Sequence, residues 1–213
     1  MSKHAGRPRY RFKPWNVGRW VLWGLFALVL LLAPLVWKSS FAHTMLSQMG
    51  IAIIACLAYN ILLGQGGMLS FGHAVYTGLG SFLAIHTLNM VAKGLPLPVS
   101  LIPLAGAAGG LFFAALLGYV TTKKSGTTFA MITLGVGELV WSMSLMLPEF
   151  FGGEGGISGN RVVGQPVLGL SFGPQIQVYY LIALYCFICT VLMFALTRTP
   201  LGRMLNAVRD NPE

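Results

Sequence analysis

Residues 64–73, which read GQGGMLSFGH, are the first candidates for chemistry in this sequence. They lie between two strongly apolar stretches, Met45–Leu63 and Phe71–Val91. Glycines, a glutamine, a serine and a histidine are unusual in such surroundings. Three interpretations are open: a plain loop, a loop that binds phosphate, or a break in membrane-embedded backbone that a solute passes.

The phosphate-binding interpretation fails on residue type. A Walker A loop requires G-x-x-x-x-G-K-[ST]. Gly67 and Gly72 have the spacing of its two glycines, but His73 and Ala74 follow in place of lysine and serine or threonine. We therefore expect no nucleotide on this chain and no cofactor of its own, so that any ATP hydrolysis belongs to a partner.

A break in membrane-embedded backbone agrees better with the composition of this segment. Non-helical backbone is tolerated at membrane depth only where protein buries it or where it lines a water-filled cavity. Where two half-helices meet, free N–H and C=O groups can bind the polar parts of a solute, and a helix N-terminus favours an anion. Ser70 is the residue expected to cap the helix that follows.

Small and polar residues continue at helical spacing beyond this segment: Ser70, His73, Thr77, Gly80, Ala84 and Thr87. Such a stripe on an apolar helix predicts either a lined passage or a face for close helix packing. Gly106-x-x-x-Gly110 is a second signal of helix contact.

Glu138 is the single charged residue deep inside an apolar run. An intramembrane carboxylate is costly and is expected to face the interior of a helix bundle. It belongs to a second stripe at 3–4 spacing, formed by Thr128, Met131, Gly135, Glu138 and Ser142. We expect Glu138 either to lie on a transport path, to bond the backbone of a broken helix, or to hold helices together, and His73 is a possible partner.

The cysteines do not indicate metal chemistry. Cys186 and Cys189 have CxxC spacing, but no second Cys or His pair accompanies them, and a zinc site needs about four ligands. Together with Cys56, they are expected to be buried small hydrophobic residues.

The elements that position these residues are predicted from composition. The 213 residues are 55% hydrophobic and only 9% charged, against about 25% charged in soluble domains. Six apolar runs are long enough to cross a bilayer: Trp20–Trp37, Met45–Leu63, Ser70–Val91, Val99–Thr121, Thr127–Leu147 and Val178–Leu196. The predicted fold is an all-α, polytopic transmembrane helical bundle with a discontinuous or re-entrant segment near 64–73.

The basic residues orient this bundle. With six crossings, eleven of the fourteen Lys and Arg residues fall on one side, and Lys38, Lys93 and Arg161 fall on the other. The positive-inside rule makes the first side cytoplasmic. We expect a basic cytoplasmic tail at 1–19, a membrane domain at 20–197 with an outer loop at 148–177, and a cytoplasmic helix at 198–213. The net charge of +9 then indicates contact with anionic lipid headgroups and not with nucleic acid.

Four motifs resemble one known family, the LivM-type permease subunit of branched-chain amino acid ABC importers. They are LAYNILLGQGGMLSFGHAVYTGLGSF (57–82), TTFAMITLGVGELV (127–140), FFGGEGGISG (150–159) and TRTPLGRMLNAVRDNPE (197–213). They occur in the expected order across most of residues 45–213. In such a family the chain continues with further spans, so we expect this sequence to be a fragment that ends inside the coupling helix.

The resemblance implies a multi-pass protein of the bacterial inner membrane. It also implies partners: a second homologous permease, two cytoplasmic ATPase subunits and a periplasmic binding protein. Residues that match the family's intramembrane signature, and so belong to the translocation path or its gate, are Asn60, Gly64, Gly67, Ser70, Gly72, His73 and Glu138. Residues that match its ATPase-coupling helix are Arg198, Gly202, Arg203, Arg209 and Asp210.

The predicted function is transport of branched-chain amino acids, or of a related small polar solute such as urea or an amide, without catalysis by this chain. A secondary transporter of a polar solute is an alternative, although neither coupling-ion sites nor inverted repeats are visible. A membrane scaffold subunit that does not transport is another alternative, but it leaves the carboxylate of Glu138 unexplained.

Overall fold

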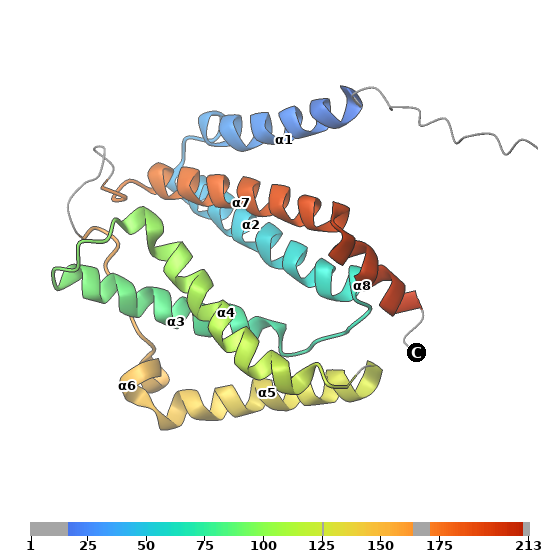
Figure 1. Ribbon diagram of the computed structural model, residues 1–213. Coiled ribbons are helices and arrows are strands. Elements are labelled where there is room, and N and C mark those ends of the chain that lie inside the picture. Colours follow the sequence, from blue (N-terminus) through green and yellow to red (C-terminus); the bar gives the residue numbers. More distant parts are fainter. Residues whose placement is uncertain (1–16, 125, 164–170, 211–213) are drawn as a thin grey trace, which may run out of the picture.

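The computed structural model describes residues 17–124, 126–163 and 171–210, and every regular element in those ranges is helical. The long helices are α1 (Val17–Val36), α2 (Ser40–Asn60), α3 (His73–Ala92), α4 (Ile102–Thr121), α5 (Gly126–Met146) and α7 (Gln175–Arg198), and the shorter ones are α6 (Pro148–Phe151) and α8 (Pro200–Asp210) (Figure 1). A π-helical turn, Ile61–Gln65, extends α2, and a 3₁₀ turn, Val99–Leu101, precedes α4.

Six of these helices are long and apolar enough to cross a membrane, as the sequence predicts. Their ends differ from the expected ones. The first helix begins at Val17 and not at Trp20, and the third begins at His73 and not at Ser70. The second is the longest candidate span, because the π turn carries it to Gln65. Residues 1–16 of the expected tail lie outside the described residues.

The apolar side chains of these helices are largely exposed within the chain. Leu111 is 72% exposed and Met146 is 77% exposed. A helix that leaves such surface open is stable where lipid or further protein surrounds it, because its backbone hydrogen bonds are satisfied within the helix. The exposure therefore agrees with a membrane environment.

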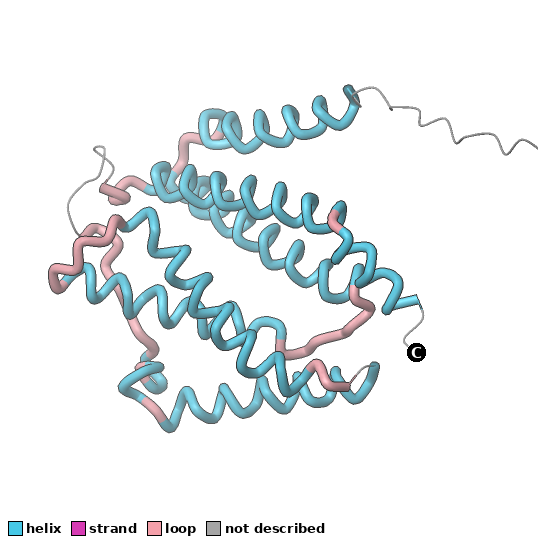
Figure 2. The backbone as a smooth tube through the Cα atoms, in the orientation of Figure 1, coloured by secondary structure: helices cyan, strands magenta, loops and turns pink. Residues whose placement is uncertain are grey.

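The long helices form two groups (Figure 1). In one group α2 packs along α7, and α1 lies on the outer side of α7. In the other group α3 packs along α4, and α5 lies beneath them. The segment from Gly66 to Gly72 links the two groups (Figure 2).

Small residues bring α3 and α4 into close contact. A β-carbon on Gly80 would lie 2.7 Å from the carbonyl oxygen of Gly106 and 3.4 Å from Cα of Gly110. A β-carbon on Gly106 would lie 3.0 Å from that of Ala84. The G-x-x-x-G pair on α4 therefore packs on the Gly80–Ala84 part of the stripe, and packing explains that part without a passage.

A proline accounts for the strongest polar contact between α1 and α7. Pro34 has no backbone N–H, so the carbonyl of Leu30 one turn earlier has no partner within the helix. The hydroxyl of Tyr179 donates to that carbonyl at 2.8 Å, and Tyr179 is only 3% exposed. In hydrocarbon an unsatisfied carbonyl is costly, so this bond stabilises the helix pair.

We expect Tyr179→Phe to lower the free energy of unfolding by about 1 kcal/mol, the order of interhelical hydrogen bonds in membranes. The measurement is denaturation in mixed micelles, followed by circular dichroism. Tyr180→Phe is the matched control, because its hydroxyl lies 3.5 Å from the carbonyl of Leu31 and is exposed. Equal effects of the two substitutions would show that the bond to Leu30 has no special role.

Candidate functional site

The predicted break in the backbone lies between α2 and α3. In the π turn, Gly66 N–H donates to the carbonyl of Ile61 at 3.1 Å, and Gly67 N–H donates to that of Leu63 at 3.0 Å. Gly67 has a φ of +65°, a conformation that glycine adopts without strain. From there to His73 the chain is not helical (Figure 2).

The expectation that Ser70 caps α3 is wrong. The residue that precedes the helix is Gly72, and no side chain bonds the first turn. Ser70 is instead 4% exposed. The helix thus begins without a capping side chain, because a side chain at position 72 would collide with the backbone of Thr133.

Thr133 of α5 holds the broken segment, and we did not predict this residue. Its hydroxyl accepts a hydrogen bond from Phe71 N–H at 3.2 Å and donates to the carbonyl of Ala130 at 2.8 Å. A β-carbon on Gly72 would collide with the carbonyl oxygen of Thr133, so only glycine allows this approach. Thr133 is 1% exposed and shares the buried side of α5 with Phe129 and Ala130. Phe129 and Ala130 precede Thr133 by four and three positions, and this helical spacing was the signal in the sequence.

A groove of about 480 Å³ lies between α2 and α3. Three of the predicted path residues line it: Asn60, Ser70 and His73. Its other lining residues are Ala55, Cys56, Tyr59, Leu63, Phe71, Ala74 and Thr77. The ring of His73 meets that of Tyr59 edge to face, with centroids 5.5 Å apart. Nε2 of His73 is buried and has no hydrogen-bond partner, so a polar group remains to be satisfied beside the groove.

The other two predicted glycines of the segment lie toward α8. The guanidinium of Arg209 donates through Nη1 to the carbonyl of Gly64 at 2.6 Å. A β-carbon on Gly67 would lie 2.5 Å from Cγ of the same arginine. The structure therefore brings two residues predicted for the path, Gly64 and Gly67, into contact with Arg209, which is predicted for ATPase coupling. Arg209 and Gly64 are 145 positions apart in the sequence.

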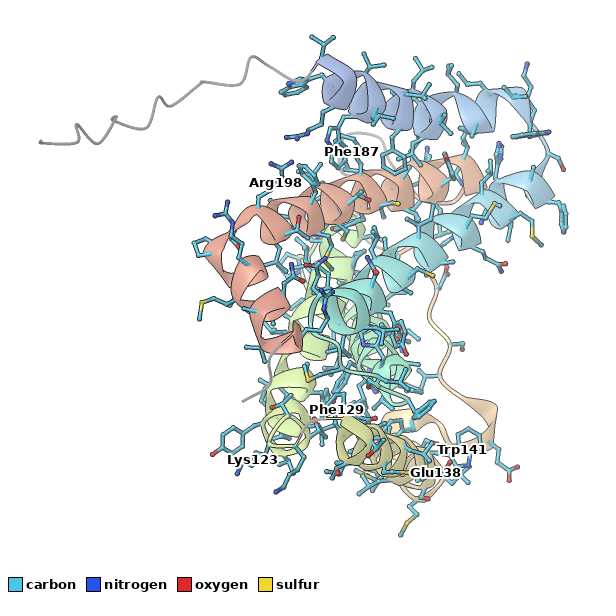
Figure 3. The ribbon with its side chains drawn as sticks, turned by 90° about the vertical axis from the view of Figure 1, so that its right-hand side faces the viewer. Lys123, Phe129, Glu138, Trp141, Phe187 and Arg198 are labelled. Atoms are coloured by element: carbon cyan, nitrogen blue, oxygen red, sulfur yellow. The ribbon has the colours of Figure 1, made fainter. Side chains whose placement is uncertain are left out.

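Glu138 does not face the interior of this chain, contrary to our expectation. The whole stripe from Thr128 to Ser142 is exposed on α5, and Figure 3 shows Glu138 and Trp141 at the edge of the molecule, away from the other long helices. Among the described residues nothing joins Glu138 to His73, and the broken backbone bonds Thr133 instead. The carboxylate is exposed on this face of α5 and can contact a neighbouring subunit, lipid or water.

The predicted coupling residues occupy the end of α7 and α8. Gly202 is buried, and a β-carbon there would lie 2.5 Å from the carbonyl oxygen of Leu196, so the two helices meet tightly. Arg198 lies over the ring of Phe194, and Arg203 is exposed. Leu201, Met204 and Val208 form an exposed apolar face. Asp210 ends α8, and its side chain lies outside the description.

The cysteines behave as separate side chains. Cys186 is fully buried and Cys189 is partly buried, as expected, whereas Cys56 is exposed toward the groove and so departs from the expectation. Within the described ranges no group of His, Cys, Asp and Glu is arranged to hold a metal ion.

Comparison with known families decides how this arrangement is interpreted. The model of one family, described as the permease component of the branched-chain amino acid transport system, matches residues 41–213. The chain belongs to this family. It is a multi-span permease subunit of the bacterial inner membrane and not an enzyme.

Two curated relatives carry the name "High-affinity branched-chain amino acid transport system permease protein LivM". The one from Salmonella typhimurium is 27% identical to this permease subunit over 236 aligned positions, which cover 98% of this chain and 54% of the relative. The one from Escherichia coli is 28% identical over 185 positions, which cover 76% and 42%. The chain thus spans about half the length of these relatives. No solved structure matches it significantly.

Proposed function

We propose that this permease subunit forms part of an ABC importer that moves branched-chain amino acids, or a related small polar solute such as urea or an amide, into the cell. The observation that carries the proposal is the broken segment between α2 and α3, which lines a groove on one side and bonds α8 on the other. Family membership supports the class of transporter. In this proposal ATP is bound and hydrolysed by partner subunits.

The charge distribution supports a cytoplasmic position for α8 and for the broken segment. Arg198, Arg203 and Arg209 lie at that end, and six basic residues precede or begin α1. α2 and its π turn span 26 residues, or about 39 Å at 1.5 Å per residue. That length exceeds the roughly 30 Å hydrocarbon core. We therefore propose that the break lies near the cytoplasmic end of a complete crossing; the alternative is a re-entrant pair.

The groove supplies the polar lining that a passing solute needs. Asn60 and His73 face it from α2 and α3, and Nε2 of His73 is without a partner. A solute amide or carboxylate would replace water bound to the exposed amide of Asn60, while the apolar groove residues would accept its side chain; Nε2 of His73 is buried and would need a side-chain movement to take part. In an alternating-access cycle the groove would open to one side of the membrane at a time.

The open face of α5 is the side we assign to the second permease subunit. A β-carbon on Gly135 or Gly137 would meet nothing within 4 Å, so another helix has room to approach. The carboxylate of Glu138 lies on the same helix and would be costly against lipid. A partner subunit, or water between the two subunits, would avoid that cost.

Uptake of leucine should require ATP when the full-length permease is reconstituted with its ATPase, its second permease and its binding protein. The measurement is accumulation of labelled leucine in proteoliposomes with ATP inside, with urea and an amide as competing solutes. A non-hydrolysable ATP analogue is the control. Uptake driven by an ion gradient alone would identify a secondary transporter, and no uptake with any partner would favour the scaffold.

Glu138→Gln should lower leucine uptake at least several-fold in correctly inserted complexes. The amide is neutral, so it loses the charged interaction that we propose between the carboxylate and the second permease subunit or the water beside it. Glu149→Gln, on the exposed first turn of α6, is the matched control. Normal uptake by the Glu138 variant would remove this carboxylate from the path and from the gate.

Arg209→Met should raise the number of ATP molecules hydrolysed per leucine transported. The variant keeps the aliphatic stem over Gly67 but loses the bond to the Gly64 carbonyl, so movement of α8 would reach the groove less efficiently. Lys124→Met removes a charge from an exposed position at the same proposed end and serves as the control. An unchanged ratio with reduced protein yield would mean that Arg209 only stabilises the fold.

A further inference from the structure

Aromatic side chains make the contact between α1 and α7 at the end where α1 begins. Trp23 meets Phe194 and Phe187 edge to face, with centroids 5.5 Å and 6.0 Å apart. Phe26 stacks on Phe187 at 6.2 Å. The two helices therefore meet through a few large rings and leave space beside them.

That space is a groove of about 490 Å³. It is lined by Gly18, Arg19, Leu22, Trp23, Phe26, Thr190 and Phe194. Apart from Arg19 and the hydroxyl of Thr190, these residues offer apolar surface. The hydroxyl of Thr190 already donates to the carbonyl of Cys186 at 2.7 Å, so it does not need a partner from the groove.

Two arginines lie close to the ring of Phe194, which lines this groove. The guanidinium carbon of Arg19 lies 5.6 Å from the centroid of Phe194, and that of Arg198 lies 5.0 Å from the same centroid. Figure 3 shows Arg198 and Phe187 on the side of α7 that faces α1. None of the three carboxylates whose side chains the structure describes, Glu138, Glu149 and Glu154, contacts either arginine.

Two like charges beside one ring repel each other, and the ring compensates only part of that repulsion. An anion between them would relieve it. Guanidinium groups bind phosphate through paired, charge-assisted hydrogen bonds. The adjoining groove is apolar and opens on the outside of a membrane helix pair, so the anion that fits both parts carries a hydrocarbon chain.

We propose that the groove between α1 and α7 binds an anionic phospholipid. Its phosphate lies between Arg19 and Arg198, and one acyl chain lies against Leu22, Trp23 and Phe26. The lipid fills the space that the aromatic contacts leave and neutralises the charge at the end of α7, one residue before the turn into α8. No residue of the segment 64–73 lines this groove, but Trp23, Thr190 and Phe194 also line a cavity of about 290 Å³ that reaches Asn60 and Gln65.

The test uses the full-length permease in lipid nanodiscs that contain a photoactivatable phosphatidylglycerol, with a phosphatidylcholine carrying the same photoreactive chain as the neutral comparison. After illumination, labelled peptides are mapped by mass spectrometry. We expect the peptides that contain Leu22–Phe26 and Thr190–Phe194 to be labelled several-fold more by phosphatidylglycerol. Equal labelling by the two lipids would overturn the proposal.

Substitutions test the contact with the lipid headgroup and the contact with the acyl chain separately. Arg19→Gln and Arg198→Gln should each reduce labelling by phosphatidylglycerol about five-fold, as expected for one basic residue near an anionic headgroup. Gly18→Leu should block labelling by either lipid, since a β-carbon there meets nothing within 4 Å and the side chain can enter the groove. Lys124→Gln is the control for loss of one basic residue at the same end. Unchanged labelling of the doubly substituted protein, Arg19→Gln with Arg198→Gln, would overturn the proposal.

Two further arms identify the occupant. Inorganic phosphate at millimolar concentration should not reduce labelling, because the hydrocarbon chain supplies part of the binding; full competition would show a phosphate site without lipid. In a separate arm a photoreactive amino acid replaces Leu22; crosslinks from this position to protein in place of lipid would show that another polypeptide covers the groove, which also overturns the proposal. Each variant is first checked by size-exclusion chromatography; a misfolded arginine-to-glutamine variant is replaced by the alanine variant, which should also lose labelling, and the lysine variant at the same position should retain it.

Discussion

A polypeptide in hydrocarbon must satisfy its own backbone, because no water is present to bond a free N–H or C=O group. This constraint explains two places where a regular helix is interrupted. Pro34 frees the carbonyl of Leu30, and Tyr179 bonds it. The non-helical segment leaves the N–H of Phe71, and Thr133 bonds it. In each case the satisfying side chain comes from a helix that is distant in sequence, so the departures also tie helices together.

Where polar bonds are absent, close approach of small residues replaces them. Lipid chains are as apolar as leucine, so burying leucine between two membrane helices gains little, and van der Waals packing of backbones decides which helices associate. α3 and α4 use Gly80, Gly106 and Gly110 in this way. α1 has no such surface against α7 and meets it through Trp23 and Phe26 at one end and through the bond from Tyr179 to Leu30 toward the other. This difference explains the groove beside α1: large rings hold α1 and α7 apart there, whereas glycines let the backbones of α3 and α4 approach closely.

The number of membrane helices could be predicted because it depends on composition and length alone. The two stripes could be identified from helical spacing, but not the neighbour that each one faces, because spacing defines a face only relative to its own helix. The stripe on α3 was therefore open to two interpretations, and the structure divides it: Gly80 and Ala84 pack on α4, while His73 and Thr77 line the groove. For the same reason Glu138 was expected inside the chain, and Thr133, four positions after the buried Phe129, was missed.

The contact between Arg209 and the π turn was beyond sequence reasoning, since it joins residues 145 positions apart. It also limits how α8 can move. This bond is exposed, so water can replace the guanidinium if the bond breaks; while the bond is made, a displacement of α8 moves Gly64 with it. Gly64 follows Asn60 by one helical turn, and a β-carbon at Gly64 would lie 2.6 Å from Oδ1 of Asn60, so displacement of the turn also shifts an amide that lines the groove. A short chain of direct contacts thus leads from the helix proposed to meet the ATPase to the residues proposed to meet the solute.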